Sequence, residues 1–188
     1  MSWGELNPDQ TRQQILVSGL GGQGVLFVSR LLAEAAIERG LNVLTSEIHG
    51  MAQRGGTVVS HLKVGGFSAP LIREEHADGL IVLKDENLGP HARFLSPYGW
   101  VVVNSKSVAP QEAIYNVHAI DAEGMAKDLG YARGANLVLL GFLIARLGDG
   151  FFCGEDDLRH AIGKRFARGT VFKESIAAFN LGIRYGKE

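Results

Sequence analysis

The sequence contains a single cysteine, Cys153, among its 188 residues. One cysteine excludes a disulfide within the chain. It also excludes an iron–sulfur cluster held by this chain alone, because such a cluster takes about four cysteine ligands, and it excludes a zinc site built from cysteines. Any redox metal chemistry in which the protein takes part must therefore reside on another chain.

A large net charge and a long apolar run are lacking as well. The chain carries 19 basic and 20 acidic side chains, a net charge of −1, which gives no electrostatic bias towards nucleic acid or an anionic membrane. The longest apolar-rich stretch, 136–147, contains Arg146 and is shorter than the roughly 20 residues that span a bilayer. The polar N-terminus lacks the pattern of a signal peptide. We therefore expect a cytoplasmic protein with no nucleic acid and no membrane among its partners.

Glycine, in contrast, is abundant, with 25 residues that cluster at the ends of apolar runs. The pattern of apolar residues predicts strands at 15–17, 41–45, 57–64, 79–83, 99–103 and 114–120, and helices at 25–39, 86–95, 122–130, 135–147, 155–166 and 172–185. This alternation predicts a three-layer α/β/α fold with a mostly parallel sheet. Because no crossover helix precedes the strand at 57–64, we expect it to run antiparallel and the sheet to be mixed. Residues 1–13 are expected to form a flexible N-terminal arm, and residues 14–188 a single domain.

Three glycines, Gly19, Gly21 and Gly24, spell G-x-G-x-x-G between a predicted strand and a predicted helix, and Glu47 follows the second strand. This is the fingerprint of a dinucleotide-binding turn, in which glycines let the backbone approach a diphosphate at a helix N-terminus. A tight strand-to-helix turn without a ligand favours the same glycines. The motif therefore leaves two interpretations open, a nucleotide site and a packing turn.

The same turn holds an extra glycine, Gly22, and a polar residue, Gln23, which are unusual for a nicotinamide site. The Gln23 amide can donate and accept hydrogen bonds, so it could seal a subunit interface or contact a ligand. Asn136, near the start of the apolar helix, could cap that helix or face the glycine turn.

Two glycine-containing segments carry a resemblance to a known family. GLGGQGV at 19–25 and HGMAQRGG at 49–56 occur together at this spacing, and the similarity continues through 57–64, 78–82 and 135–141. The pair resembles the gamma subunit, or fused gamma domain, of 2-oxoacid:ferredoxin oxidoreductases. It looks most like the small beta subunit of indolepyruvate ferredoxin oxidoreductase, because the pyruvate and 2-oxoglutarate types usually resemble GPExRG where this chain has MAQRGG.

The resemblance implies a fold like domain III of pyruvate:ferredoxin oxidoreductase and a role in a larger complex. Such a complex decarboxylates a 2-oxoacid on thiamine diphosphate, passes electrons through iron–sulfur clusters to ferredoxin and transfers the acyl group to coenzyme A. Thiamine diphosphate and the clusters belong to large partner subunits, so no cofactor is expected on this chain alone. The gamma portion packs against the thiamine-binding portion and helps to form the environment of coenzyme A and substrate. The isolated chain is expected to be inactive and could form a homodimer.

The predicted ligand- or interface-binding residues are Gly19, Gly21, Gly22, Gln23, Gly24, Glu47, Gln53, Arg54, Gly55 and Gly56. Arg54 is the foremost side chain, because a planar guanidinium suits a carboxylate or a phosphate. An ordinary salt bridge would explain it equally well. Glu47 could bind a ribose or order the Arg54 loop, and ordering is favoured. His61 is expected to be structural and Cys153 inert, and neither a catalytic residue nor a metal ligand is predicted.

Two other functions stay open at the level of sequence. A free-standing oxidoreductase could bind NAD(P) at the glycine turn, although no catalytic acid–base pair stands out. A non-catalytic assembly protein could use the same fold, since fold does not fix function.

Overall fold

The computed structural model describes residues 11–49, 56–107, 116–166 and 169–188. The strands are β1 (Gln13–Leu20), β2 (Val43–His49), β3 (Thr57–Val64), β4 (Ala77–Val82), β5 (Leu95–Asn104) and β6 (Asn116–Ile120). The helices are α1 (Val25–Glu38), α2 (Leu88–Ala92), α3 (Ala122–Asp128), α4 (Ala135–Leu147), α5 (Glu155–Arg165) and α6 (Thr170–Gly186), with 3-10 turns η1 (Asp85–Asn87), η3 (Ala132–Gly134) and η4 (Gly148–Gly150).

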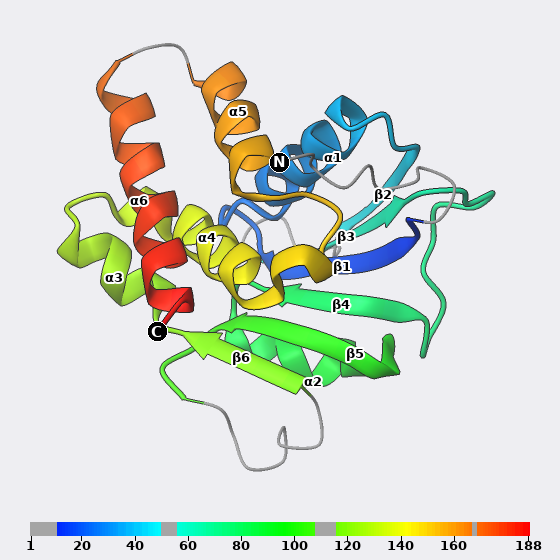
Figure 1. Cartoon of the computed structure of the whole chain (residues 1–188). Helices are drawn as coiled ribbons and strands as arrows, with labels where there is room; N and C mark the ends of the chain where they lie inside the picture. The colour runs from blue at the N-terminus through cyan, green and yellow to red at the C-terminus, as the bar shows by residue number, and fades with distance from the viewer. Residues whose placement is uncertain (1–10, 50–55, 108–115, 167–168) are drawn as a thin grey trace.

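The strands form one sheet with helices on both faces (Figure 1). Helices α1, α3, α4, α5 and α6 contribute to the apolar cluster on one face, whereas α2 packs on the other face. The predicted three-layer α/β/α architecture is therefore confirmed. None of the helices in the described ranges is long and apolar enough to cross a membrane.

The strand order across the sheet is β2-β3-β1-β4-β5-β6. Strand β3 is antiparallel to both of its neighbours, whereas β1, β4, β5 and β6 pair in parallel. The predicted mixed sheet with an antiparallel strand at 57–64 is thus confirmed. Strands β1 and β2 run in the same direction, as expected for a β-α-β unit, but β3 lies between them.

Strand β1 is buried on both faces because helical layers cover it from each side. Ile15 and Val17 pack in the cluster that contains α1 and α4, and Leu16 packs in the cluster that contains α2. The side chain of Ser18, like these three, is fully buried. In the sequence, a strand with two buried faces is a continuous apolar run rather than an alternation of apolar and polar residues. The run at 15–17 therefore predicts this strand clearly.

Helix α1 ends in a Schellman motif. Gly40 has a φ of 76°, its N–H bonds to the Ile37 carbonyl at 2.9 Å, and the Leu41 N–H bonds to the Ala36 carbonyl at 3.0 Å. These two bonds satisfy carbonyls that the helix end leaves free. Leu41 therefore belongs to the helix terminus, and β2 begins at Val43 rather than at 41.

Several other boundaries also differ from the predicted ones. Strand β1 continues through Gly19 and Leu20, so the glycine turn begins only at Gly21. The helix expected at 86–95 is reduced to η1 and the five-residue α2. Strand β5 begins at Leu95, which pairs with Ala77 of β4, four residues before the start at 99 that the apolar run suggests.

Candidate functional site

The glycine turn links β1 to α1 at the carboxyl end of the strand. Gly22 and Gly24 have φ angles of 95° and 89°, a region that side chains other than glycine rarely adopt. Gly19 is needed for another reason, because a Cβ there would lie 2.9 Å from the Leu83 Cβ and 3.0 Å from Val25 Cγ2. A Cβ on Gly24 would collide with the Asn136 side-chain amide. Backbone angles and close packing therefore both account for the glycines of the fingerprint.

Gln23 closes this turn upon itself. Its side-chain Oε1 accepts a hydrogen bond from the Leu20 N–H at 2.7 Å, and its own N–H donates to the Leu20 carbonyl at 3.1 Å. The Gly21 N–H donates to the carbonyl of Gly56 at 3.0 Å. These N–H groups are thus satisfied within the chain, which leaves the turn fewer donors for a diphosphate than a dinucleotide-binding turn would present.

Glu47 lies away from the glycine turn. It is an exposed residue within β2 rather than beyond it, opposite Ser60 of β3. Because β3 separates β2 from β1, Glu47 is about two strand spacings, or roughly 10 Å, from β1. In the dinucleotide-binding fold the second strand lies directly beside the first, which brings its acidic residue to the ribose. The strand order therefore argues against the dinucleotide interpretation of this motif.

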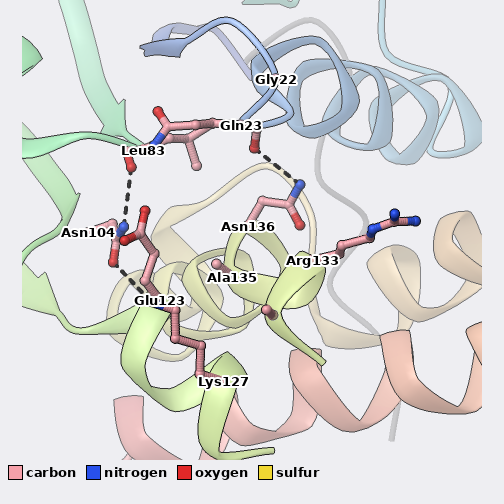
Figure 2. A pocket seen from close by; sticks show the side chains of 10 residues that line it. Gly22, Gln23, Leu83, Asn104, Glu123, Lys127, Arg133, Ala135 and Asn136 are labelled. Atoms are coloured by element: carbon pink, nitrogen blue, oxygen red, sulfur yellow. Dashed lines mark hydrogen bonds between the residues drawn. The ribbon is translucent and has the colours of Figure 1, made fainter. Parts of the chain in front are cut away.

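A cavity of about 210 Å³ lies beside the glycine turn. Its lining consists of Gly22, Gln23, Leu83, Asn104, Glu123, Lys127, Ala132, Arg133, Ala135 and Asn136 (Figure 2). The cavity sits at the carboxyl ends of β1, β4 and β5. From β1 the chain continues towards β2, on one side in the sheet, and from β4 it continues towards β5, on the other side. The direction in which successive strands are added therefore reverses between β1 and β4. Such a switch point is where open α/β sheets bind ligands.

Two asparagines fix the walls of this cavity. Asn104 Nδ2 donates to the Leu83 carbonyl at 3.2 Å, and its Oδ1 accepts from the Glu123 N–H at 3.3 Å. Asn136 Nδ2 donates to the carbonyl of Gln23 at 3.5 Å. Figure 2 shows these bonds joining the two strand ends to α3 and the glycine turn to α4. Asn136 therefore faces the glycine turn, which decides between the two roles that the sequence left open.

The charged side chains of the cavity come from α3 and η3. Glu123 and Lys127 lie on α3, and Arg133 lies in η3 on the far side of Asn136 (Figure 2). Within the described ranges neither Lys127 nor Arg133 forms an ion pair. The cavity can therefore receive a polar group that carries negative charge.

The structure brings together only some of the predicted site residues. Gly22 and Gln23 line the cavity, Gly19, Gly21 and Gly24 shape the turn, and Gly56 bonds to Gly21. Gln53, Arg54 and Gly55 lie outside the described residues. Sequence reasoning missed Asn104, Glu123, Lys127 and Arg133. Asn104 could have been found as the polar residue that ends an apolar strand, but the other three gave no comparable signal.

His61 and Cys153 are structural, as expected. His61 is buried, and its Nδ1 accepts a hydrogen bond from the Ile72 N–H at 3.1 Å, so the proton of the neutral ring resides on Nε2. Burial, followed by the charges of Lys63 and His91, lowers the pKa of His61. Cys153 is buried, and burial together with Asp157 raises the pKa of its thiol. Among the described residues, no group of three His, Cys, Asp or Glu side chains could hold a metal ion.

Comparison with known proteins identifies the family. A family model described as pyruvate ferredoxin/flavodoxin oxidoreductase matches residues 14–185. The indolepyruvate oxidoreductase subunit IorB of Archaeoglobus fulgidus is 46% identical over 99 residues, which cover 53% of this chain and 49% of that protein. The subunit of the same name from Thermococcus kodakarensis is 26% identical over 196 residues, which cover 93% of this chain and 96% of that protein.

A solved structure supports the same assignment. The keto/oxoacid ferredoxin oxidoreductase gamma subunit from Geobacter sulfurreducens matches with a TM-score of 0.74 and 26% sequence identity, and the match covers 93% of this chain and 98% of that chain. The chain therefore belongs to the pyruvate ferredoxin/flavodoxin oxidoreductase family, which confirms the resemblance carried by the two glycine-containing segments. Its relatives of matching length are named as single subunits of indolepyruvate or keto/oxoacid oxidoreductases. The match to the Archaeoglobus protein spans about half of that relative.

Proposed function

We propose that this chain is the small subunit of a thiamine-diphosphate-dependent 2-oxoacid:ferredoxin oxidoreductase of the indolepyruvate type. The complex converts an arylpyruvate, coenzyme A and oxidised ferredoxin into acyl-CoA, carbon dioxide and reduced ferredoxin. The observation that carries the proposal is the match to the indolepyruvate oxidoreductase subunit of Thermococcus kodakarensis, which spans 96% of that protein. The complex is proposed to be cytoplasmic.

In this proposal the cofactors reside on large partner subunits. The single buried cysteine of this chain supports that division of labour, because an iron–sulfur cluster requires several thiolates. When bound to its own subunit, thiamine diphosphate supplies the carbanion chemistry of decarboxylation, and the clusters supply the electron path to ferredoxin. The exposed apolar side chains of Ile48, Leu71 and Tyr98 are consistent with a partner surface, and they are the reason to expect a homodimer when the chain is isolated.

The cavity beside the glycine turn is proposed to contribute to the environment of coenzyme A. Its cations Lys127 and Arg133, which form no ion pair in the part of the chain that the structure describes, suit a phosphate group. Its volume of about 210 Å³ is below the roughly 300–1,000 Å³ of a pocket that encloses a whole drug-sized ligand. The chain would therefore hold one phosphate-bearing end, and the partner subunit would complete the site.

The experiment that tests the proposal is co-expression of this chain with the large subunit of an indolepyruvate-type oxidoreductase. The purified complex is assayed for reduction of ferredoxin with indolepyruvate, phenylpyruvate, pyruvate and 2-oxoglutarate as substrates. We expect kcat/KM to be highest for the aryl substrates, and we expect the isolated chain to have no turnover. A chain that remains alone and binds NAD or NADP would instead favour the nicotinamide alternative, and an inert complex would favour an assembly protein.

The role of the cavity is tested by Lys127→Ala, with Lys173→Ala on the exposed side of α6 as the matched control. Loss of one phosphate contact is expected to raise KM for coenzyme A about tenfold, the equivalent of about 1.4 kcal/mol. The KM for the 2-oxoacid should not change. Equal KM values for coenzyme A in the two variants would remove the cavity from the proposal and leave the subunit assignment intact.

A further inference from the structure

Two cations, Arg12 and Lys63, lie over one aromatic ring at the end of the sheet opposite the glycine turn, and a third cation, Arg73, lies near Lys63. The Arg12 guanidinium lies 4.4 Å from the centroid of the Phe67 ring, and Lys63 Nζ lies 5.1 Å from it. Arg73 is close enough to affect the titration of Lys63. Arg12 immediately precedes β1, Lys63 is in β3, and Phe67 and Arg73 lie in the connection from β3 to β4, on the right of the sheet in Figure 1.

No counter-ion within the described ranges balances this cation cluster of Arg12, Lys63 and Arg73. None of the three forms an ion pair there. Two neighbouring carboxylates are engaged elsewhere. Asp78 accepts the Gln14 N–H at 2.7 Å, and Glu74 pairs with Arg93 at 3.2 Å. Burial also raises the pKa of the Asp78 carboxyl, which is the opposite of what a carboxylate paired with these cations would show.

Lys63 is the member of the cluster for which the missing anion matters most. The residue as a whole is only 7% exposed, but its Nζ is not among the fully buried side-chain atoms that lack a hydrogen-bond partner, so the apolar stem is covered while the ammonium reaches solvent. Burial lowers the pKa of Lys63, and the positive charges of Arg73 and Arg12 lower it further. Within the described ranges, like charges therefore repel one another at this place, and an anion from outside would relieve that repulsion.

The cluster presents its charge on an open surface. Arg12 and Arg73 are exposed, and Phe67 is half-buried between the charged side chains. Small ligands are usually bound in concave sites, whereas an exposed cluster of like charge is typical of electrostatically complementary protein interfaces. Arginine side chains stacked on an aromatic ring are also enriched at interfaces.

We propose that the cluster of Arg12, Lys63 and Arg73 docks an acidic segment of the large partner subunit. This inference rests on the proposed function, because it takes the partner from that complex. A carboxylate of the segment pairs with Lys63 at the rim of Phe67, and further carboxylates pair with the two guanidinium groups. The surface is separate from the cavity at the glycine turn, since the two lie at opposite ends of β1.

The test compares assembly of three full-length chains with the purified partner subunit at several salt concentrations. The first is wild type, the second carries Arg12→Gln, Lys63→Met and Arg73→Gln, and the third carries Arg30→Gln, Lys173→Gln and Arg184→Gln. The third chain is the matched control, because it loses the same number of charges from exposed positions on α1 and α6. We expect the cluster variant to raise Kd at least tenfold and to flatten its salt dependence, and the control to retain the wild-type values.

A second measurement separates docking from a structural role. In the isolated chain, Lys63→Met keeps the apolar stem and removes the uncompensated charge, so the urea midpoint should shift upward while assembly weakens. A downward shift would mean that an anion within the chain already satisfies Lys63, and it would overturn the proposal. A hexaglutamate peptide should compete with assembly. Competition by inorganic phosphate at the same ionic strength would show a site for small anions instead.

The outcomes also separate this inference from the proposed function. If the wild-type chain fails to bind the large subunit, both proposals fall. If the wild-type and cluster variants bind equally well, or if the control weakens as much as the cluster variant, only the docking site is overturned.

Discussion

Gly141 of α4 and Gly182 of α6 lie in one helix–helix contact, each against the backbone of the other helix. A Cβ on Gly141 would collide with the Phe179 carbonyl, and a Cβ on Gly182 would collide with the Val138 carbonyl. The two helices therefore approach as closely as only glycine permits. Through this contact α6 covers the outer side of α4, whose residues from Leu137 to Ile144 are all buried.

Substitution of either glycine should destabilise the fold. Gly141→Ala and Gly182→Ala force the helices apart, and overpacking of this kind costs about 1–3 kcal/mol even though alanine is the better helix former. Urea unfolding measures the loss. Gly89→Ala in α2 is the control, because a Cβ there would meet nothing within 4 Å. It should be neutral or slightly stabilising, and an equal loss in all three variants would contradict the prediction.

The glycine turn allows backbone strain to be separated from side-chain contact. Gly22→Ala introduces a Cβ at a φ of 95° but into open space, so it should cost about 1–2 kcal/mol from backbone strain alone. Gly24→Ala adds the collision with Asn136 and should cost more. In an Asn136→Ala background the difference between the two should shrink. A difference that persists there would mean that Asn136 is not the obstacle.

Acid should destabilise the protein through one buried histidine, His61, and two half-buried ones, His91 and His118. Burial is the largest cause that lowers the pKa of His61, His91 and His118. In the unfolded chain they take up protons near pH 6.5, so below that pH the unfolded state binds more protons than the native state. The contribution of these histidines to the free energy of unfolding should therefore be constant above about pH 6.5. At lower pH the free energy of unfolding should fall, by at most about 1.4 kcal/mol per pH unit for each histidine.

His61→Asn tests this prediction for one histidine. The asparagine side chain keeps an acceptor for the Ile72 N–H but does not titrate. Urea unfolding between pH 7.5 and 5 should show a shallower loss of stability in the variant than in wild type. Parallel curves would show that His61 does not contribute to the acid sensitivity.

The single thiol should report on unfolding. Only the thiolate reacts quickly with disulfide reagents, and both the burial of Cys153 and its raised pKa disfavour that form. In native buffer we expect labelling to be limited by opening of the structure, and in concentrated urea we expect one rapid reaction per chain. Complete labelling of the native protein during mixing would show that Cys153 is accessible.

Much of the architecture could be predicted because local patterns determine it. The helices α1, α4, α5 and α6 and the doubly buried β1 follow from apolar periodicity. The early start of β5 could not be seen, since Ser96, Pro97 and Tyr98 look like a turn. Pro97 and Tyr98 are exposed in the strand. The placement of β3 between β1 and β2 depends on long-range pairing, for which the sequence offers no local signal.

The candidate site was predictable only where one segment forms it. The glycine turn was found because its residues are contiguous in the chain. The contributions of Asn104 and Lys127 depend on which strands are neighbours, and so does the separation of Glu47 from the glycine turn. The prediction for Arg54 remains untested, because that residue lies outside the described ranges.

The central position of β1 has a consequence for the dynamics of the turn that follows it. The strand pairs with β3 on one side and β4 on the other, and its residues from Ile15 to Ser18 are fully buried. Amide protons in such a strand exchange with solvent chiefly through global unfolding, whereas an edge strand such as β2 exchanges through local opening. We therefore expect the turn to be tethered to a slowly exchanging segment and to keep its position when the edge of the sheet opens.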